Sequence, residues 1–352
     1  MTSPRALPSQ VEVLIVGAGQ AGLAIAQILG RAGLSYRIVD RGARVGGSWR
    51  ERWDSLRLFT PGPVSGLPGM AFPPTAGFVP TKDEMADYLE AYARRFAIPV
   101  ELGSPVGALR REARGLVAAS SAGEIVARRV VVATGTFQRP HLPALARDLG
   151  PAVFQLHSAA YRRPSQLPPG PVLVVGAANS GAQIAADLAG DRAVHLSIGK
   201  RLPTPPQKMR ESLIAWRFAA FRSVHLRFLE PSGLPWPIGL AKFVIPAPER
   251  LAREHGVTLL PRAVAARGTE ILLEDGRSLA VASVVWATGY RPDHGWIALD
   301  AFDAAGAPRC ERPLPGLYFL GQLGSARLLP GVAAAARRLA RRMLRDRADA
   351  PG

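Results

Sequence analysis

Residues 11–40 decide the fold and read VEVLIVGAGQAGLAIAQILGRAGLSYRIVD. The stretch opens with a short apolar run, residues 13–16, that has the length and composition of a buried parallel strand. Apolar residues at helical spacing follow, and a second apolar run ends on Asp40. Between the strand and the helix stand three glycines in the pattern G-x-G-x-x-G, which are Gly17, Gly19 and Gly22. Together these features predict a βαβ unit that binds a dinucleotide.

Each of these residues has a physical reason to be there. Gly17 permits the tight turn from strand to helix, Gly19 lets a pyrophosphate approach the backbone, and Gly22 lets the helix pack closely on the strand. The helix N-terminus directs unpaired N–H groups and a partial positive charge at the phosphates. Asp40 lies 18 residues after Gly22, close to the spacing of an acid that binds a ribose 2′-hydroxyl. The alternative is a glycine-rich turn in an ordinary βαβ unit.

Composition places the 352 residues in the globular class, and the length predicts about two domains. The single cysteine, Cys310, excludes a disulfide scaffold, a cysteine-ligated metal site and a C-x-x-C redox pair. The first ten residues lack the apolar core of a signal peptide, and no uncharged apolar run of about 18 residues predicts a membrane span. We therefore expect a cytoplasmic protein without a metal site.

A net charge of +17 is compatible with nucleic acid or an anionic membrane as a partner. The arginines are dispersed, however, and no nucleic-acid-binding motif is present, so we expect most of them on solvated faces and no nucleic acid as a partner. One local cluster leaves contact with an acidic partner open. It lies near the C-terminus and contains Arg337, Arg338, Arg341, Arg342, Arg345 and Arg347.

The opening pattern returns once in the chain. The apolar run 172–175 is followed by Gly176-Ala177-Ala178-Asn179-Ser180-Gly181 and by a predicted helix. Each copy ends on an apolar strand and a Thr-Gly pair, with 118 residues from Gly17 to Gly135 and 113 from Gly176 to Gly289. This duplication predicts two nucleotide-binding units in tandem, and residues 140–171 between them form a proline-rich, linker-like stretch.

The two units differ in the residues directly after their second strand. The first ends on an acid, which suits a ribose with free hydroxyl groups, as in FAD or NAD. The second has Lys200 and Arg201 in that place, and cations suit a ribose 2′-phosphate, as in NADPH. The alternative is two solvated basic residues at a strand end. Ala178 replaces the middle glycine of the second triplet, so its methyl group should raise the KM for NADPH without abolishing binding.

Across both units, the sequence resembles the class B flavoprotein monooxygenases, in particular short bacterial members related to flavin-containing monooxygenases and to plant auxin-forming enzymes. The motifs that carry the resemblance are GAGQAG, GGSW with WDSLRL and TPG, ATGT, HSAAYR, GAANSG, ATGYRPD and YFLGQLGSA. It implies an α/β fold with two nested Rossmann-type dinucleotide-binding domains, one for FAD and one for NADPH, each with a small antiparallel β-meander. Residues 1–148 and 290–352 would form the FAD domain, and residues 149–289 the NADPH domain with a short helical cap at about 204–248.

The resemblance also implies which residues bind the cofactors. For FAD they are Gly17, Gly19, Gln20, Gly22, Asp40, Arg41, Gly47, Ser48, Trp49, Val106, Thr134, Gly135, Gly321 and Gln322. For NADPH they are Gly176, Asn179, Ser180, Gly181, Lys200, Arg201, Thr288 and Gly289. No catalytic side chain stands out. Thr60 and His157 are weak candidates, and we expect His157 to be a packed or hinge histidine rather than a base.

The implied activity is that of a monooxygenase that depends on FAD and NADPH, in which a C4a-(hydro)peroxyflavin transfers one oxygen atom to a small organic substrate. That substrate and O₂ would be the partners of a monomer or homodimer, and amines, sulfides, ketones and 2-oxo acids all stay open as substrates. One alternative is an NADPH:FAD oxidoreductase or oxidase that releases hydrogen peroxide without oxygen transfer. Another is a non-enzymatic flavoprotein that binds an acidic partner.

Overall fold

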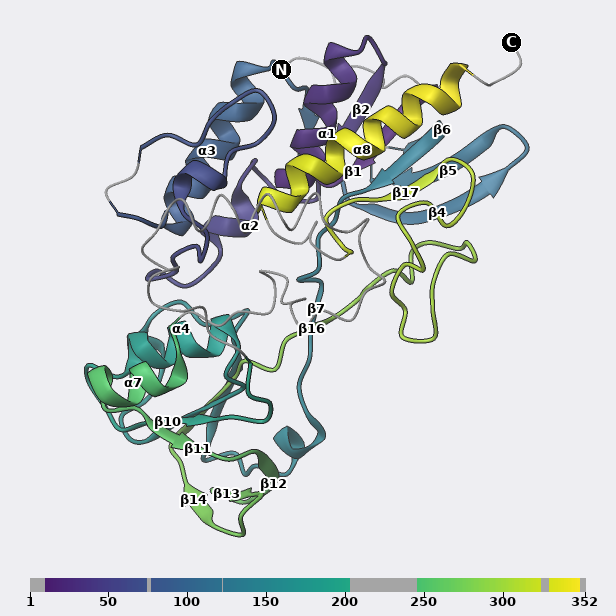
Figure 1. Ribbon diagram of the computed structural model, residues 1–352. Helices are drawn as coiled ribbons and strands as arrows, with labels where there is room; N and C mark the ends of the chain where they lie inside the picture. The colour runs from purple at the N-terminus through teal and green to yellow at the C-terminus, as the bar shows by residue number, and fades with distance from the viewer. Residues whose placement is uncertain (1–9, 75–76, 122, 203–245, 324–328, 349–352) are drawn as a thin grey trace, which may run out of the picture.

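The protein is built from two α/β units, each around its own parallel sheet. The computed structural model describes residues 10–74, 77–121, 123–202, 246–323 and 329–348. The chain passes from the first unit to the second and back through two short strands, β7 (Arg139–Pro140) and β16 (Tyr290–Arg291). These strands pair with each other in antiparallel fashion between the two units (Figure 1).

The first sheet follows from the apolar runs that open and close the sequence. Its parallel strands are β1 (Gln10–Val16), β2 (Tyr36–Val39), β3 (Val100–Glu101), β6 (Gly123–Val132) and β17 (Leu317–Phe319). The strand order is β3-β2-β1-β6, and β17 pairs with the last residues of β6. On the first half of β6 lies an antiparallel meander of β5 (Gly115–Ser120) and β4 (Val106–Glu112).

Side chains alternate between two buried faces along the second half of β1, which explains why residues 13–16 are all apolar. Val13 and Ile15 pack into one core with α1 (Gln20–Arg31), α3 (Lys82–Arg95) and α8 (Leu329–Ala348), while Leu14 and Val16 pack into another with the meander. α8 lies along α1 (Figure 1). Helix α3 begins with a capping box, since Glu84 N donates to Thr81 Oγ1 and Thr81 N donates to the Glu84 carboxylate.

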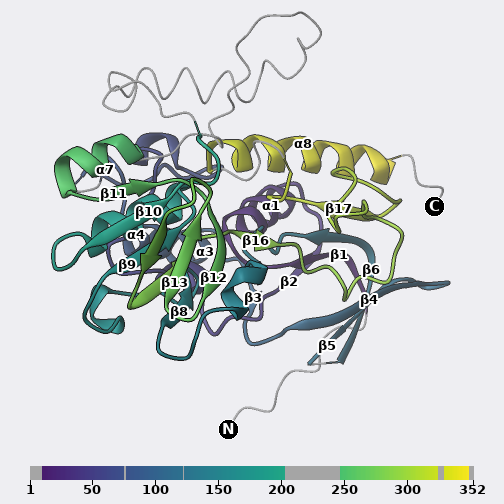
Figure 2. The ribbon, with the colours of Figure 1, turned by 90° about the horizontal axis from the view of Figure 1, so that it is seen from below.

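The second unit repeats the plan with its own parallel sheet, in the order β11-β10-β9-β15-β8. The strands are β8 (Phe154–His157), β9 (Val172–Val175), β10 (Val194–Ser197), β11 (Thr258–Leu260) and β15 (Ser283–Trp286). Helices α4 (Asn179–Leu188) and α7 (Pro248–His255) pack with each other beside this sheet. The other face carries a meander of β12 (Ala263–Arg267), β13 (Glu270–Leu273) and β14 (Ser278–Ala280), seen again from below in Figure 2.

The predicted fold class is confirmed: there are two Rossmann-type sheets, each with its antiparallel meander. The prediction of a linker over residues 140–171 was partly wrong, because Phe154–His157 pairs with β15 as the edge strand β8. The prolines before and after those four residues made the strand difficult to predict from the sequence. Its conformation is stabilised by pairing within the sheet. The helical cap predicted at about 204–248 falls almost entirely outside the described residues. No helix in the described part of the chain is long and apolar enough to cross a membrane.

Candidate cofactor sites

The first and third glycines of the two strand-to-helix turns make the same backbone contacts. A Cβ atom added to Gly22 would lie 1.8 Å from the carbonyl oxygen of Gly17, and one added to Gly181 would lie 1.7 Å from that of Gly176. Gly17 (φ +106°) and Gly176 (φ +103°) both have a left-handed backbone, and a Cβ there would strike the carbonyl oxygen of the neighbouring strand end. Both copies of the sequence motif therefore produce the same close packing of the helix on the backbone of the preceding turn.

The middle position of each triplet is different, because it faces open space. A Cβ atom added to Gly19 would meet no atom within 4 Å, so the space there is free for a ligand. Gly19 (φ −75°, ψ −171°) and Ala178 (φ −78°, ψ −178°) have nearly the same conformation, which any residue can adopt. Ala178 is exposed, so its methyl group projects into the cradle of the second turn, at the position that Gly19 leaves empty in the first. The predicted rise in the KM for NADPH depends on this geometry, and the rise itself stays a prediction.

Asp40 lies where the predicted ribose-binding acid should be, at the end of β2 beside the first turn. Its carboxylate accepts hydrogen bonds from the backbone N–H of Ala18 (2.6 Å) and of Gly42 (2.7 Å). Each carboxylate oxygen has a further lone pair for a hydroxyl group. The segment before Val106 lies alongside, since Ser104 N donates to Asp40 O at 2.8 Å. Arg41 follows and is exposed.

Gly46, next to the predicted FAD residue Gly47, has a role in packing. A Cβ on Gly46 would lie 2.8 Å from the carbonyl oxygen of Ala86 on α3. Gly46 (φ +75°) therefore lets the short helix α2 (Gly47–Arg50) pack against α3. Gly47 and the exposed Ser48 belong to α2, and only Arg44 Cγ, at 3.7 Å, comes near a Cβ built on Gly47.

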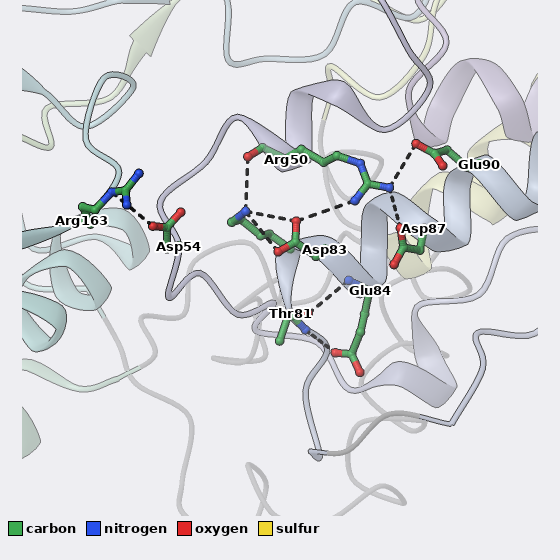
Figure 3. Close-up of polar contacts among 9 residues, drawn as sticks. Arg50, Asp54, Thr81, Asp83, Glu84, Asp87, Glu90 and Arg163 are labelled. Carbon is green, nitrogen blue, oxygen red and sulfur yellow. Dashed lines mark hydrogen bonds and ion pairs between the residues drawn. The ribbon is translucent and has the colours of Figure 1, made fainter.

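Arg50 at the end of α2 clamps this turn to α3. Its guanidinium group lies 2.5 Å from Asp87, 3.1 Å from Glu90 and 3.8 Å from Asp83, all on one side of α3 (Figure 3). On the same short helix, Trp49 Nε1 donates to Gln20 Oε1 over 3.4 Å, so the turn also touches the first residue of α1. The clamp and this contact hold α2 beside the open cradle at Gly19.

The carboxyl ends of β1, β6 and β17 lie side by side, and three predicted FAD-binding segments follow them. Gly17 comes after β1, Thr134 and Gly135 after β6, and Gly321 and Gln322 after β17. Gln322 Nε2 donates to Thr134 Oγ1 at 3.1 Å, which joins two of these segments directly. Ligands of open α/β sheets bind outside the carboxyl ends of the strands. The structure thus brings the predicted FAD residues together at one edge.

In the second unit, Asn179, Ser180 and Gly181 form the first turn of α4, and Lys200 and Arg201 follow the end of β10. Both basic side chains are exposed, and Arg201 lies 3.5 Å from Glu249. A third cation, which we did not predict, lies here. Arg262 Nη2 donates to the carbonyl oxygen of Gly199 at 2.7 Å. The only sequence signal for Arg262 is a basic residue after an apolar strand. That signal is weak because this sequence has many arginines.

Thr288 and Gly289, which we predicted to bind NADPH, lie with His157 at the crossing between the units. Thr288 Oγ1 donates to the carbonyl oxygen of His141, and Gly289 (φ +83°) has the left-handed backbone of a sharp turn. His157 is 7% exposed and both its ring nitrogens meet backbone groups, with Nε2 3.0 Å from Gly289 O and Nδ1 3.1 Å from Ala159 N. These contacts favour the packed or hinge interpretation of His157. Burial lowers the pKa of its imidazole.

The other weak candidate, Thr60, is buried in its own loop, where its hydroxyl group lies 2.9 Å from Ser65 Oγ.

The loop after α2 also spans the two units. Asp54 N donates to Arg162 O at 2.8 Å, and the Asp54 carboxylate lies 3.6 Å from Arg163 (Figure 3). This loop therefore connects the α2 turn of the first unit to Arg162 and Arg163 of the second unit.

One buried donor in this loop has no hydrogen-bond partner within the part of the chain that the structure describes. Among the described residues, the indole Nε1 of Trp53 is buried and has no hydrogen-bond partner, although its neighbour Arg52 donates to the Tyr290 hydroxyl at 2.8 Å. A buried donor without an acceptor costs free energy of folding unless a ligand or water accepts its hydrogen bond. A large groove of about 800 Å³ lies elsewhere, at the amino ends of β1, β2 and β3, away from both turns. The open cradle at Gly19 agrees with a bound dinucleotide.

Comparison with known proteins gives the same picture. Residues 14–224 match the pyridine nucleotide-disulphide oxidoreductase family. The chain is 41% identical over 337 residues to an uncharacterized oxidoreductase CzcO-like of Geobacillus kaustophilus, covering 92% of this chain and 95% of that protein. It is 29% identical over 327 residues to a rice indole-3-pyruvate monooxygenase, YUCCA8, covering 82% and 78%. A solved flavin-containing monooxygenase from Stenotrophomonas maltophilia superposes with a TM-score of 0.82 at 27% identity, covering 96% and 99%.

Proposed function

Because the chain belongs to the pyridine nucleotide-disulphide oxidoreductase family and is a flavoprotein monooxygenase-like member of it, we propose that it is an NADPH-dependent monooxygenase. In this reaction two electrons come from NADPH, one atom of O₂ enters a small organic substrate, and the other leaves as water. The observation that carries the proposal is the pair of matched turns, one followed by Asp40 and the other by Lys200 and Arg201.

In this proposal FAD lies along the carboxyl edge of the first sheet. Asp40 would bind the ribose, the open cradle at Gly19 the pyrophosphate, and the α2 turn and Gln322 the flavin end. When bound, FAD supplies the redox chemistry, since it accepts electrons from NADPH and passes them to O₂. The chain's contribution is to hold the two nucleotides in place and to keep water out.

NADPH would occupy the second turn. Asn179, Ser180 and Gly181 open α4 at the pyrophosphate, while Lys200, Arg201 and the newly found Arg262 offer positive charge for the 2′-phosphate. The FAD domain would comprise residues 1–148 and 290–352 and the NADPH domain residues 149–289, so that the β7–β16 crossing is the boundary. We expect His157 to stabilise that crossing through Gly289.

The single cysteine separates this protein from family members that reduce disulfides. A dithiol mechanism needs two cysteines beside the flavin, and the sequence has only Cys310. A second candidate function is release of hydrogen peroxide without oxygen transfer, which the same two nucleotide sites would support.

The test is to purify the protein, record its visible spectrum, and reduce it without oxygen by NADPH or NADH. Heavy-oxygen-labelled O₂ is then admitted with a panel of amines, sulfides, ketones and 2-oxo acids. We expect a flavin spectrum, faster reduction by NADPH, and a product that carries one labelled atom in proportion to the NADPH used. Peroxide equal to the NADPH consumed, across the whole panel, would establish the second candidate instead.

A further inference from the structure

A chain of polar side chains connects the crossing segment to the proposed flavin edge. His294 Nε2 lies 2.9 Å from Gln322 Oε1, and Gln322 Nε2 lies 3.1 Å from Thr134 Oγ1. Gln138 closes the chain, since its Nε2 donates to Thr134 Oγ1 at 3.0 Å and its Oε1 accepts from Asp293 N. His294 is 8% exposed and Gln322 is 3% exposed, so the two central members are buried. Buried polar chains of this kind are costly unless every member is satisfied.

The ring of His294 is fixed in place by three neighbours. It stacks on Phe302 with ring centroids 4.9 Å apart and planes inclined by 14°, and it meets Phe319 edge-on at 5.7 Å. Its Nδ1 lies 3.0 Å from the carbonyl oxygen of Gly306. A carbonyl oxygen only accepts, so Nδ1 must carry a proton. His294 therefore presents Nε2 to Gln322 in one fixed direction.

The contact at Nε2 determines which end of the Gln322 amide faces the ring. With a proton on Nε2, the ring donates to Gln322 Oε1, and the amide nitrogen donates to Thr134, as the distances allow. Gln138 Nε2 lies 3.4 Å from the same ring nitrogen, so a second amide meets the ring at this position. In this arrangement, His294 orients the Gln322 amide so that its nitrogen faces Thr134.

We propose that His294 is a positioning residue, which sets the orientation of the Gln322 amide and thereby the polar wall at the carboxyl ends of β6 and β17. This inference rests on the proposed function, because it takes that edge to be the flavin site. The contact links the crossing segment that follows β16 to the same edge. A shift of the crossing segment would thus reach the flavin site through the contact of His294 with Gln322 and, beside it, through Gln138.

Two variants separate the two contacts of the ring. The amide of Asn reaches about as far as Nδ1, so His294→Asn keeps the anchor on Gly306 and loses Gln322. The amide of Gln reaches about as far as Nε2, so His294→Gln keeps Gln322 and loses Gly306. Both are made in the full chain and again in a Gln322→Leu background. For each holoenzyme we would measure the reduction potential of the bound flavin, the dissociation constant of FAD and the melting temperature.

We expect His294→Asn to shift the flavin potential and to weaken FAD binding roughly fivefold, the ratio that one hydrogen bond of about 1 kcal/mol gives. His294→Gln should keep the parental potential even if it melts earlier, and neither variant should move the potential in the Gln322→Leu background. Equal potentials in His294→Asn and His294→Gln, or a shift that persists without Gln322, would overturn the role of His294 while leaving the flavoprotein intact. A protein that takes up no flavin would refute the proposed function, and this role with it.

A measurement on the unmodified holoenzyme does not depend on how the variants fold. Nitrogen NMR of the histidine rings reports which ring nitrogen carries a proton, and the His294 signal is identified by its loss in His294→Gln. We expect a proton on Nδ1, because the Gly306 carbonyl oxygen beside it can only accept. A ring protonated on Nε2 alone would contradict the geometry and overturn the proposal.

Discussion

Alanine at the third glycine of the first triplet should damage the fold, whereas alanine at the second should damage only cofactor binding. The Cβ atom of Gly22→Ala would lie 1.8 Å from the carbonyl oxygen of Gly17, and both groups belong to the backbone. The helix must retreat from the strand by more than about 1 Å to restore contact at about 3 Å. Overpacking costs about 1–3 kcal/mol and occasionally more, and here no flexible side chain can give way. We expect a loss of about 3 kcal/mol in the free energy of unfolding.

Gly19→Ala is the matched control, three residues away in the same turn. Its Cβ atom would meet no atom within 4 Å, and its φ of −75° suits alanine. Gly-to-Ala at a compatible site changes stability by about 0.4–1 kcal/mol, in the favourable direction. The new methyl group would occupy the cradle proposed for the pyrophosphate, so FAD affinity should fall at least roughly tenfold, or about 1.4 kcal/mol.

The assay is thermal unfolding of the two variants, followed by titration with FAD. We expect the melting temperature of Gly22→Ala to fall by roughly 5–10 °C, and that of Gly19→Ala to stay at or above the parental value. Gly181→Ala should behave like Gly22→Ala, because its Cβ would lie 1.7 Å from Gly176 O. Parental stability in Gly22→Ala would refute the packing argument, and parental FAD affinity in Gly19→Ala would refute the location of the cradle.

Four further predictions concern the second unit, the α2 turn and the crossing. Ala178→Gly removes the exposed methyl from the second cradle and should lower the KM for NADPH, and an unchanged KM would disprove the steric account. Arg262→Ala should raise the KM for NADPH severalfold and leave that for NADH unchanged, if its guanidinium group at Gly199 O meets the 2′-phosphate. Arg50→Gln breaks the clamp on α3 and should cost about 1 kcal/mol of unfolding free energy and weaken FAD binding, while the exposed Arg41→Gln should cost no stability. Burial lowers the pKa of His157 below 6.5, so the unfolded chain binds more protons and stability should fall as pH falls through 6.5 toward the lowered value; urea unfolding should show a weaker fall in His157→Gln.

Local patterns sufficed to predict the features whose causes are local. The two glycine triplets and the short apolar strands before them depend on residues within a few positions of one another, so a short stretch of sequence reveals them. The strand β8 escaped prediction because four residues among prolines gain their conformation from pairing with β15, far along the chain. Local propensity is weak there, and the sheet supplies the hydrogen bonds.

Sequence by itself determined that this chain forms two nucleotide-binding turns, because the packing of a helix on its own strand needs glycine at fixed spacing. The tertiary structure alone decided which distant groups meet at those turns. Gly46 meets Ala86 on α3, Arg262 reaches Gly199 across 63 positions, and Gln322 reaches Thr134 across 188. The order of strands in the sheets sets these encounters, and strand order depends on the burial of every strand and helix at once.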